Sequence, residues 1–271
     1  MSSSKSSPTT SPVAIVLAAG KGTRMKSDLP KVLHRAAGAS MVRWVVRALR
    51  EIGAGPIVLV IGHGADLVRQ EFAGDDDLRF ALQSEQLGTG HAVACGLTAL
   101  SPEEARRDVI VLCGDGPLVR GTTLAALMQA HGRSHAAATL ATSRVPDPTG
   151  YGRIDRDERG RFRGIVEHGD ATEAQRRISE INPSVYAFRG EVLGAALPRL
   201  GRANAKGEIY LTDVFSLLLA DEHAGRLASP AVEVVAAVPP EEVLSVNTPE
   251  QLAEVDRILR ARGAAAGGAR A

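Results

Sequence analysis

The residues Val13-Ala-Ile-Val-Leu-Ala-Ala-Gly-Lys-Gly-Thr-Arg-Met-Lys-Ser-Asp-Leu-Pro-Lys31 form an apolar run followed by a loop with two glycines. This pattern is typical of a buried strand that ends in a glycine loop. Glycines let the backbone approach a ligand, and the exposed N–H groups of such a loop form a concave site for anions. The loop also has three more positive than negative side chains, in a chain of net charge +1: Lys21, Arg24, Lys26 and Lys31 against Asp28. It is therefore predicted to bind phosphate.

Beyond this loop, apolar runs alternate with amphipathic segments. Strands are predicted at 57–61, 79–83 and 109–112, and helices at 41–52, 66–72 and 91–100. Ser40 is placed to cap the helix 41–52, and Gly53 to end it. Strands this apolar need both faces covered, and helical crossovers favour parallel pairing. We therefore expect an α/β fold with a doubly wound, mainly parallel, Rossmann-like sheet, which would bind ligands at the carboxyl ends of its strands.

The second half of the chain has shorter elements. Strands predicted at 136–141, 152–154, 162–166 and 185–188 are joined by tight turns, which indicates a smaller mixed β excursion. A helix at 211–219, a strand at 231–238 and a strand-like run at 243–246 follow. Thr248-Pro-Glu-Gln251 is predicted to open a last helix with a capping box and a proline at its first position. The predicted organisation is a tail at 1–12, a folded domain at 13–248, a C-terminal helix at 249–263 and a second tail at 264–271.

Composition and charge exclude several classes of protein. The 32 basic and 31 acidic residues leave no positive excess for binding nucleic acid. Cys95 and Cys113 lie in apolar runs without C-x-x-C spacing, which favours reduced thiols in a cytoplasmic protein over a disulfide or a zinc site. The Ser/Thr-rich start lacks the apolar stretch of a signal peptide, and no segment approaches the ~20 apolar residues of a membrane helix. We expect a cytoplasmic protein that binds neither nucleic acid nor membrane.

Two known phosphate loops do not fit the glycine loop. A Walker A loop needs Ser or Thr directly after Gly-Lys, but Gly22 follows Lys21. The dinucleotide fingerprint needs a third glycine where Met25 stands and an acidic residue after the second strand, where Gly62 and His63 stand. A nicotinamide-dependent oxidoreductase is therefore disfavoured.

Seven blocks of the sequence resemble one family when they are taken together: 17–34, 83–92, 114–115, 147–154, 164–168, 180–182 and 207–213. In this order, from about Val13 to Asn247, they are similar to the uridylyltransferase domain of bacterial N-acetylglucosamine-1-phosphate uridylyltransferases. The motif L-A-A-G-x-G-x-R-M marks the wider sugar-nucleotidyltransferase superfamily. The later blocks make the resemblance specific.

The resemblance implies transfer of the uridylyl group of UTP to N-acetylglucosamine 1-phosphate, with release of pyrophosphate and a requirement for Mg²⁺. The product would be UDP-N-acetylglucosamine, a cell wall precursor. The sugar phosphate would attack the α-phosphorus in line, so catalysis would consist of holding two anions together and neutralising the charge that develops. The domain would have a nucleotide-binding half, 13–118, and a sugar-binding half, 119–248.

The resemblance also implies roles for individual residues. The nucleotide would contact Leu17, Ala18, Ala19, Gly20, Gln83, Gly88 and Thr89. A buried amide such as that of Gln83 discriminates between bases, because the wrong base leaves it unsatisfied. The catalytic residues would be Arg24, near the leaving pyrophosphate, and Lys31, on the phosphates at the reacting centre. The sugar would contact Gly114, Gly152, Glu167 and Asn182.

Asp115 and Asn247 would hold Mg²⁺, which takes few protein oxygens and completes its shell with phosphates and water. Without the resemblance, both would be interpreted as ordinary turn residues, because Asp115 lies in Asp-Gly-Pro and Asn247 precedes a helix cap. Their assignment to a metal site therefore depends on the resemblance.

The chain departs from the family pattern beside the substrate blocks. Cys113 replaces an aromatic residue, Gly116 replaces a hydrophobic one, and Asn182-Pro-Ser184 replaces Asn-Thr-Gly. Pro183 removes a backbone donor and restricts its neighbour to an extended conformation. Two alternatives stay open: another sugar 1-phosphate or nucleotide as substrate, or a catalytically silent UDP-sugar-binding protein. Because the family's C-terminal β-helix has no counterpart in the sequence, we expect no acetyl-CoA chemistry, and the oligomeric state is left open.

Overall fold

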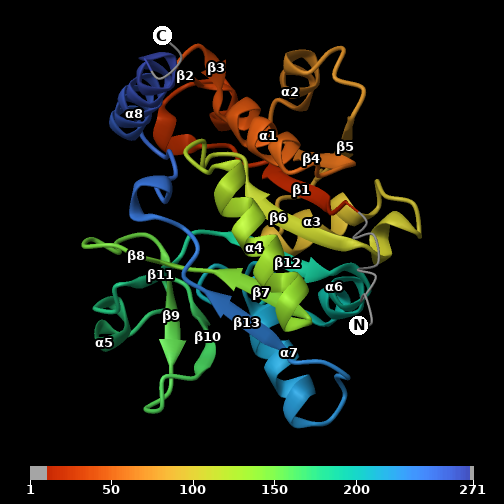
Figure 1. Cartoon of the computed structure of the whole chain (residues 1–271). Helices are drawn as coiled ribbons and strands as arrows, with labels where there is room; N and C mark the ends of the chain where they lie inside the picture. The colour runs from red at the N-terminus through yellow and green to blue at the C-terminus, as the bar shows by residue number, and fades with distance from the viewer. Residues whose placement is uncertain (1–10, 269–271) are drawn as a thin grey trace, which may run out of the picture.

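The first strand, β1 (Val13–Ala18), lies inside a seven-stranded sheet in the computed structural model, which describes residues 11–268 (Figure 1). It pairs in parallel with β4 (Ile57–Ile61) and β6 (Asp108–Cys113), and β5 (Leu78–Leu82) pairs in parallel with β4. All five residues of β4 are buried, as expected of a strand covered on both faces.

The strand order of the main sheet is β13-β7-β12-β6-β1-β4-β5. The chain runs from β1 outward through β4 and β5 and then returns to the other side of β1 as β6. The carboxyl ends of β1 and β6 therefore meet at a topological switch point, where sheets of this type bind ligands. Three further strands complete the sheet: β7 (Ala138–Ala141), β12 (Val185–Arg189) and β13 (Val232–Val235). Only β12 is antiparallel to its neighbours, so the predicted mainly parallel sheet is confirmed.

The predicted β excursion is a separate sheet of four strands: β8 (Ser143–Arg144), β9 (Gly152–Arg156), β10 (Phe162–Val166) and β11 (Glu180–Asn182). Its pairings are all antiparallel and not mixed. Figure 1 shows it in green beside the main sheet. The strands predicted near 136–141 and 185–188 belong instead to the main sheet, because they are buried on both faces. The main sheet therefore contains strands from both predicted halves.

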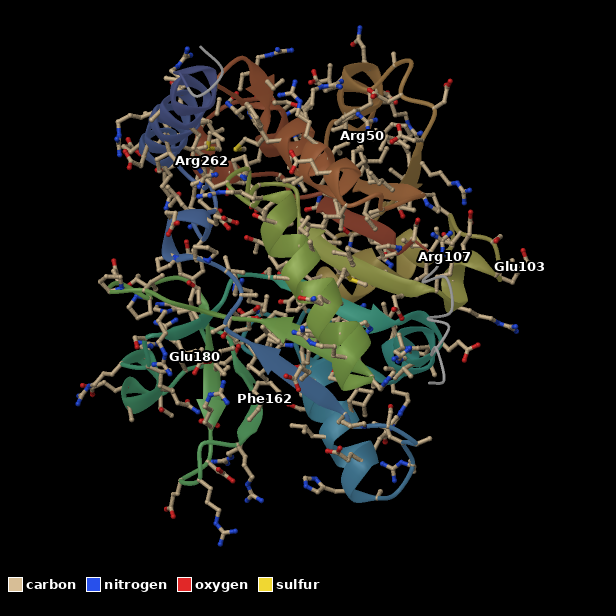
Figure 2. All side chains as sticks on the ribbon, in the orientation of Figure 1. Arg50, Glu103, Arg107, Phe162, Glu180 and Arg262 are labelled. Atoms are coloured by element: carbon tan, nitrogen blue, oxygen red, sulfur yellow. The ribbon has the colours of Figure 1, made fainter. Side chains whose placement is uncertain are left out.

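The small sheet is attached to the main domain through aromatic side chains. Phe162, labelled in Figure 2, meets Phe215 of α7 (Asp213–His223) edge-on, with ring centroids 6.2 Å apart. Phe215 in turn packs against Tyr186 and Phe188 of β12. Such edge and tilted contacts add to the free energy of apolar burial, and they hold the two sheets in one arrangement.

Helices cover both faces of the main sheet. One face packs against α1 (Met41–Glu51), α2 (Ala65–Glu71) and α4 (Gly121–Ser134). The other packs against α3 (Thr89–Leu97), α6 (Gly190–Ala196) and α7. A single helical turn, α5 (Glu173–Arg176), lies beside the small sheet. Helix α4 was not predicted from the sequence, because it has two glycines and begins without a side-chain cap. Among the described residues, no helix has the length and apolar character needed to cross a membrane.

The C-terminal helix, α8 (Pro249–Gly268), extends beyond the predicted end at 263, and residues 1–10 and 269–271 of the predicted tails lie outside the described part of the chain. The predicted capping box is confirmed. The Gln251 backbone N–H donates to Thr248 Oγ1 at 3.3 Å, and Gln251 Oε1 accepts from the Thr248 N–H at 3.2 Å. Figure 1 shows α8 beside the hairpin of β2 (Arg35–Ala36) and β3 (Ala39–Ser40).

Two local predictions were wrong. The run 243–246 forms no strand, because the chain there crosses beside the sheet and does not pair along a strand. The Val246 N–H donates to the Asp115 carbonyl at 3.0 Å. Ser40 precedes α1 but its hydroxyl does not cap the helix, since it donates to Glu71 Oε1 at 2.9 Å. Gly53 does follow the helix end in a left-handed conformation, with φ of 68°, as predicted.

Two glycines in helices should respond oppositely to substitution by alanine. A Cβ on Gly96 of α3 would lie 2.7 Å from Ile15 Cγ2 in the core, whereas one on Gly132 of α4 would meet nothing within 4 Å. Gly96→Ala should lower the free energy of unfolding by about 1–3 kcal/mol through overpacking. Gly132→Ala should raise it by about 0.5–1 kcal/mol, because alanine is the better helix former. Urea denaturation measures both, and equal effects at the two sites would contradict the described packing of α3 on β1.

Candidate functional site

The glycine loop after β1 is shaped so that Lys31 can lie against it. Gly22 has φ of 62°, and a Cβ at that position would lie only 2.5 Å from Lys31 Cβ. Gly64, with φ of 63°, leaves room in the same way for the ring of Pro30. Met25 is buried and packs in one apolar cluster with Val255 and Leu259 of α8. Left-handed glycines and a buried anchor therefore position the lysine.

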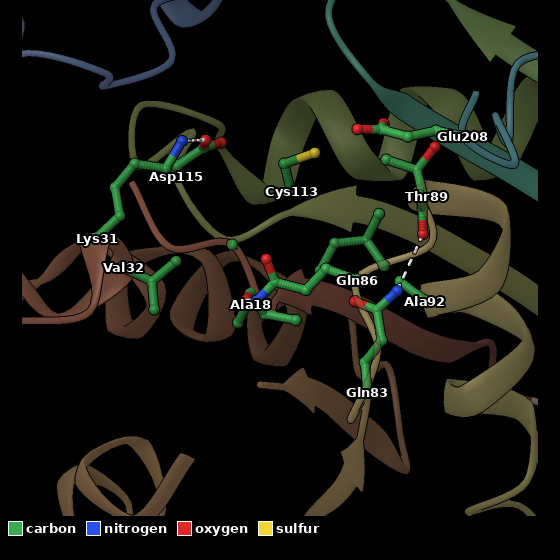
Figure 3. Close-up of a pocket in the computed structure, with 14 residues that line it drawn as sticks. Ala18, Lys31, Val32, Gln83, Gln86, Thr89, Ala92, Cys113, Asp115 and Glu208 are labelled. Atoms are coloured by element: carbon green, nitrogen blue, oxygen red, sulfur yellow. Dashed lines mark hydrogen bonds and ion pairs between the residues drawn. The ribbon is translucent and has the colours of Figure 1, made fainter. Parts of the chain in front are cut away.

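Four predicted side chains meet at the carboxyl ends of β1 and β6. The ammonium group of Lys31 forms a close ion pair with Asp115 and donates to Asn247 Oδ1 at 3.1 Å. Arg24 Nη2 donates to the same Asn247 oxygen at 2.8 Å. The Lys31 and Asp115 side chains are only 14% and 16% exposed, so their charges are poorly screened by water. Figure 3 shows these two side chains pointing toward one another.

Asn247 is held in place by the helix that follows it. Its backbone N–H donates to Gln251 Oε1 at 2.7 Å, within the capping box of α8. The neighbouring Val246 N–H donates to the Asp115 carbonyl. On the other side, the Gly114 N–H donates to the Leu17 carbonyl at 2.9 Å and joins the loop after β6 to β1. Backbone hydrogen bonds thus fix the two oxygen-bearing side chains relative to the glycine loop.

The oxygens of Asp115 and Asn247 fit a divalent cation. Both contact the ammonium group of Lys31, so both oxygens face the same positively charged group. A carboxylate and an amide carbonyl are hard oxygen donors of the kind that Mg²⁺ prefers. The described residues contain no cluster of three or more His, Cys, Asp or Glu side chains that could hold a metal. The remaining ligands would have to come from substrate and water.

A first cavity of about 230 Å³ lies beside this cluster (Figure 3). It is lined by the predicted residues Leu17, Ala18, Ala19, Gly20, Lys31, Gln83, Gly88, Thr89 and Asp115. Its wall also contains five residues that were not predicted to bind substrate: Val32, Gln86, Ala92, Cys113 and Glu208. Of these, Gln86 donates to the Ala19 carbonyl at 2.9 Å and joins two predicted blocks. Arg24 and Asn247 lie outside the lining, although they contact the charged cluster.

The loop at 87–90 is held by hydrogen bonds to residues 209–211, which are distant in the sequence. A Cβ on Gly88, whose φ is 116°, would lie 2.5 Å from the Ile209 carbonyl oxygen. The Gly90 N–H donates to that carbonyl at 2.8 Å, and the Leu211 N–H donates to Thr89 Oγ1 at 2.9 Å. This docking brings Glu208 into the wall of the first cavity.

A second cavity of about 150 Å³ adjoins the first and shares with it the lining residues Leu17, Thr89, Cys113 and Glu208. Glu167 lies in its wall and accepts a hydrogen bond from Thr212 Oγ1 at 3.1 Å. Burial raises the pKa of the Glu167 carboxyl above its ordinary value. The wall also contains residues that the sequence analysis did not assign, although some lie in its blocks: Ser184, Tyr186, Lys206, Tyr210 and Thr212.

Gly114, Gly152 and Asn182, three of the predicted sugar-binding residues, line neither of these two cavities. Asn182 is 4% exposed; its Nδ2 donates to the Tyr186 hydroxyl at 2.7 Å, and its Oδ1 accepts from the Ser184 N–H at 3.0 Å. Gly152 packs behind it, where a Cβ would lie 3.5 Å from Asn182 Cβ. In this structure, Asn182 therefore supports two residues of the second cavity's wall from behind.

The chain is similar to known proteins over most of its length. Residues 14–185 match the family described as MobA-like NTP transferase domain. Bifunctional protein GlmU of Trichlorobacter lovleyi is 48% identical over 249 residues, covering 92% of this chain and 52% of that protein. Its counterparts in Geobacter metallireducens and Streptomyces griseus are 49% and 48% identical and cover 92% and 93% of this chain, but 50% and 52% of those proteins. The chain spans about half the length of the curated relatives it matches.

A solved structure shares the fold at low identity. HddC from Yersinia pseudotuberculosis superimposes with a TM-score of 0.63 and 18% identity, over 92% of this chain and 99% of that one. This similarity supports the α/β architecture.

The buried carboxyl of Glu167 should make stability depend on pH in a specific direction. Because its pKa is raised in the folded protein, the protonated form stabilises the fold below the ordinary value of 4.5. This stabilisation is lost as the pH rises through the raised pKa. Glu167→Gln cannot ionise, so its free energy of unfolding relative to the wild type should increase between pH 4.5 and neutral pH. Urea denaturation at several pH values tests this, with the exposed Glu158→Gln as the control. A difference that stays constant with pH would contradict the buried state of Glu167.

Proposed function

Since the chain belongs to the MobA-like NTP transferase family, we propose that it transfers the uridylyl group of UTP to N-acetylglucosamine 1-phosphate. The products would be UDP-N-acetylglucosamine and pyrophosphate. The observation that carries the proposal is the meeting of Lys31, Asp115, Arg24 and Asn247 beside the first cavity. The choice of uracil and amino sugar is supported by the sequence blocks at 83–92 and 207–213, which dock on one another around the two cavities.

The two adjoining cavities suit a direct reaction between two bound substrates. UTP would occupy the first cavity, whose wall includes Lys31 and Asp115, and the sugar would occupy the adjoining second cavity, so that the sugar phosphate could approach the α-phosphate of UTP. An oxygen of the sugar phosphate forms a bond to the α-phosphorus, and the bond from that phosphorus to the bridging oxygen of the β-phosphate breaks. Pyrophosphate leaves with the electron pair. Because no side chain forms a covalent bond, the protein contributes position and charge.

Lys31 is placed to neutralise phosphate charge. At an effective dielectric near 20, two unit charges about 4 Å apart interact by about 4 kcal/mol. If the full interaction of about 4 kcal/mol were gained only in the transition state, the reaction would be about a thousandfold faster. Arg24 is exposed, so water screens its charge and a smaller contribution is expected from it.

The side chains alone do not balance the charge of the substrates. Lys31 and Arg24 contribute two positive charges and Asp115 removes one, whereas a triphosphate and a sugar phosphate bring several negative charges. We propose that Asp115 and Asn247 hold Mg²⁺, whose bound charge would stabilise the phosphoryl oxygens. The two free thiols, Cys95 and Cys113, agree with a cytoplasmic site of action.

In the second cavity, the Glu167 carboxylate is the proposed acceptor for sugar hydroxyls, with Thr212 donating to it from behind. Asn182 would act through Tyr186 and Ser184, whose positions it sets. Gly114 and Gly152 would contribute close backbone packing.

A substrate panel tests the proposed function. Pyrophosphate release is measured for UTP, CTP, ATP and GTP, each with N-acetylglucosamine 1-phosphate and with glucose 1-phosphate, in Mg²⁺ and in excess EDTA. We expect the highest kcat/KM for UTP with the amino sugar, and no turnover in EDTA. Preference for the non-amino sugar would reassign the substrate. Binding of UDP-sugars without any pyrophosphate release would indicate the catalytically silent alternative.

Removal of the Lys31 charge should slow the reaction without unfolding the protein. Lys31→Ala should lower kcat by about 10²-fold or more, the scale of losing one preorganised charge stabiliser. Lys26→Ala is the matched control, because Lys26 is exposed and is not among the residues that line the first cavity; its kcat should change by less than about threefold. Steady-state kinetics and circular dichroism of both variants decide the point. An unchanged kcat in Lys31→Ala would refute its role.

A further inference from the structure

His91 contacts the Gln83 side chain from α3, beside the first cavity that Gln83 lines. Gln83 is 4% exposed, and its Nε2 lies 3.0 Å from the Gly88 carbonyl oxygen and 3.2 Å from His91 Nδ1. The other ring nitrogen of His91, Nε2, lies 3.6 Å from Cys95 Sγ, one helical turn further along α3. Figure 3 shows Gln83 with the first of these hydrogen bonds as a dashed line.

The chemistry of these contacts fixes the direction of each hydrogen bond. The Gly88 carbonyl can only accept, so the amide group that faces it is the NH₂ of Gln83. The second hydrogen of that NH₂ is directed at His91 Nδ1, which must then accept. The ring nitrogen that bears the proton is therefore Nε2, where the sulfur of Cys95 can accept weakly. Burial raises the pKa of the Cys95 thiol, which keeps this sulfur uncharged.

With both hydrogens of its NH₂ used in this way, Gln83 has its carboxamide oxygen left for a ligand in the cavity that it lines. An oxygen acceptor matches the N3–H donor of uracil. Opposite the N3 acceptor of cytosine, the same oxygen would find two lone pairs facing one another. We propose that His91 is a positioning residue for base specificity: by accepting from Gln83, it holds the amide oxygen toward the base and so favours uridine over cytidine nucleotides. This inference rests on the proposed binding of UTP in the first cavity.

The Gly88 carbonyl and His91 act in the same direction. A flipped Gln83 would set its oxygen against the Gly88 carbonyl and against the unprotonated Nδ1 of His91. Removal of the imidazole leaves the carbonyl as the single remaining restraint. The loss of one neutral hydrogen bond should lower the preference for UTP over CTP by about threefold to tenfold.

Three variants of the full chain separate positioning from packing. His91→Phe keeps a ring but removes both nitrogens. His91→Asn places an amide oxygen close to the position of Nδ1 and can still accept from Gln83. Cys95→Ala removes the neighbour of Nε2 and leaves the Gln83 contact intact. For each variant, the Kd values of UTP and CTP are measured by calorimetry with Mg²⁺, and the fold is checked by circular dichroism.

The ratio of the Kd for CTP to the Kd for UTP should fall about threefold to tenfold in His91→Phe, mainly through weaker UTP binding. It should stay within about twofold of the wild type in His91→Asn and in Cys95→Ala. A folded His91→Phe protein that keeps the wild-type ratio, or weakens both nucleotides equally, would overturn the inference and leave the proposed function standing. A wild-type chain that binds UTP no better than CTP would overturn both.

The tautomer provides a second test that needs no nucleotide. Long-range ¹H–¹⁵N NMR spectra distinguish a protonated from an unprotonated imidazole nitrogen, and the His91 signals are assigned by their absence in His91→Phe. We expect His91 at neutral pH to carry its proton on Nε2. A proton on Nδ1 would make His91 a donor toward Gln83 and would overturn the inference.

Discussion

The ion pair between Lys31 and Asp115 is the interaction on which the geometry of the site depends. It joins the loop after β1 to the loop after β6, and the same ammonium group reaches Asn247 at the start of α8. Residues 84 and 216 positions apart from Lys31 in the sequence are thereby brought to one point. Since the chain has a net charge of only +1, this local cluster, and not the overall field of the protein, would provide the attraction for phosphate in the proposed function.

The backbone around the ion pair has little freedom to change. Gly22 and Gly64 are in left-handed conformations, and a side chain at either position would collide with Lys31 or Pro30. Met25 anchors the loop in the cluster shared with α8, so the C-terminal helix supports the site although it contributes no lining residue to the two cavities. At the first cavity, the Gln83 amide is held by hydrogen bonds to the Gly88 carbonyl and to His91. The charged and polar groups of the site are thus each positioned by contacts from surrounding segments.

Local signals allowed the parallel sheet, the glycine loop and the capping box of α8 to be predicted, because each is determined by neighbouring residues. The run 243–246 shows the limit: its apolar pattern is that of a strand, but it pairs with no strand of the sheet and crosses beside the loop after β6, where the Val246 N–H donates to the Asp115 carbonyl. Glu208 and Lys206 were missed because they reach the cavities only through the docking of 207–211 on 87–90, a contact between distant segments. The partners of Asn182 likewise depend on a turn with Ser184 at φ of 60°. The assignment of Asp115 and Asn247 to one site, where both contact Lys31, followed from family resemblance and could not be derived from their spacing.

The most direct test of the account is a crystal structure of the chain with UTP and Mg²⁺. We expect the triphosphate against the backbone of 17–20, with Lys31 moved from Asp115 onto a phosphate and the cation bound by the oxygens of Asp115 and Asn247. A structure with the glycine loop empty and Lys31 still paired with Asp115, or with the two oxygens too far apart to share one cation, would contradict it.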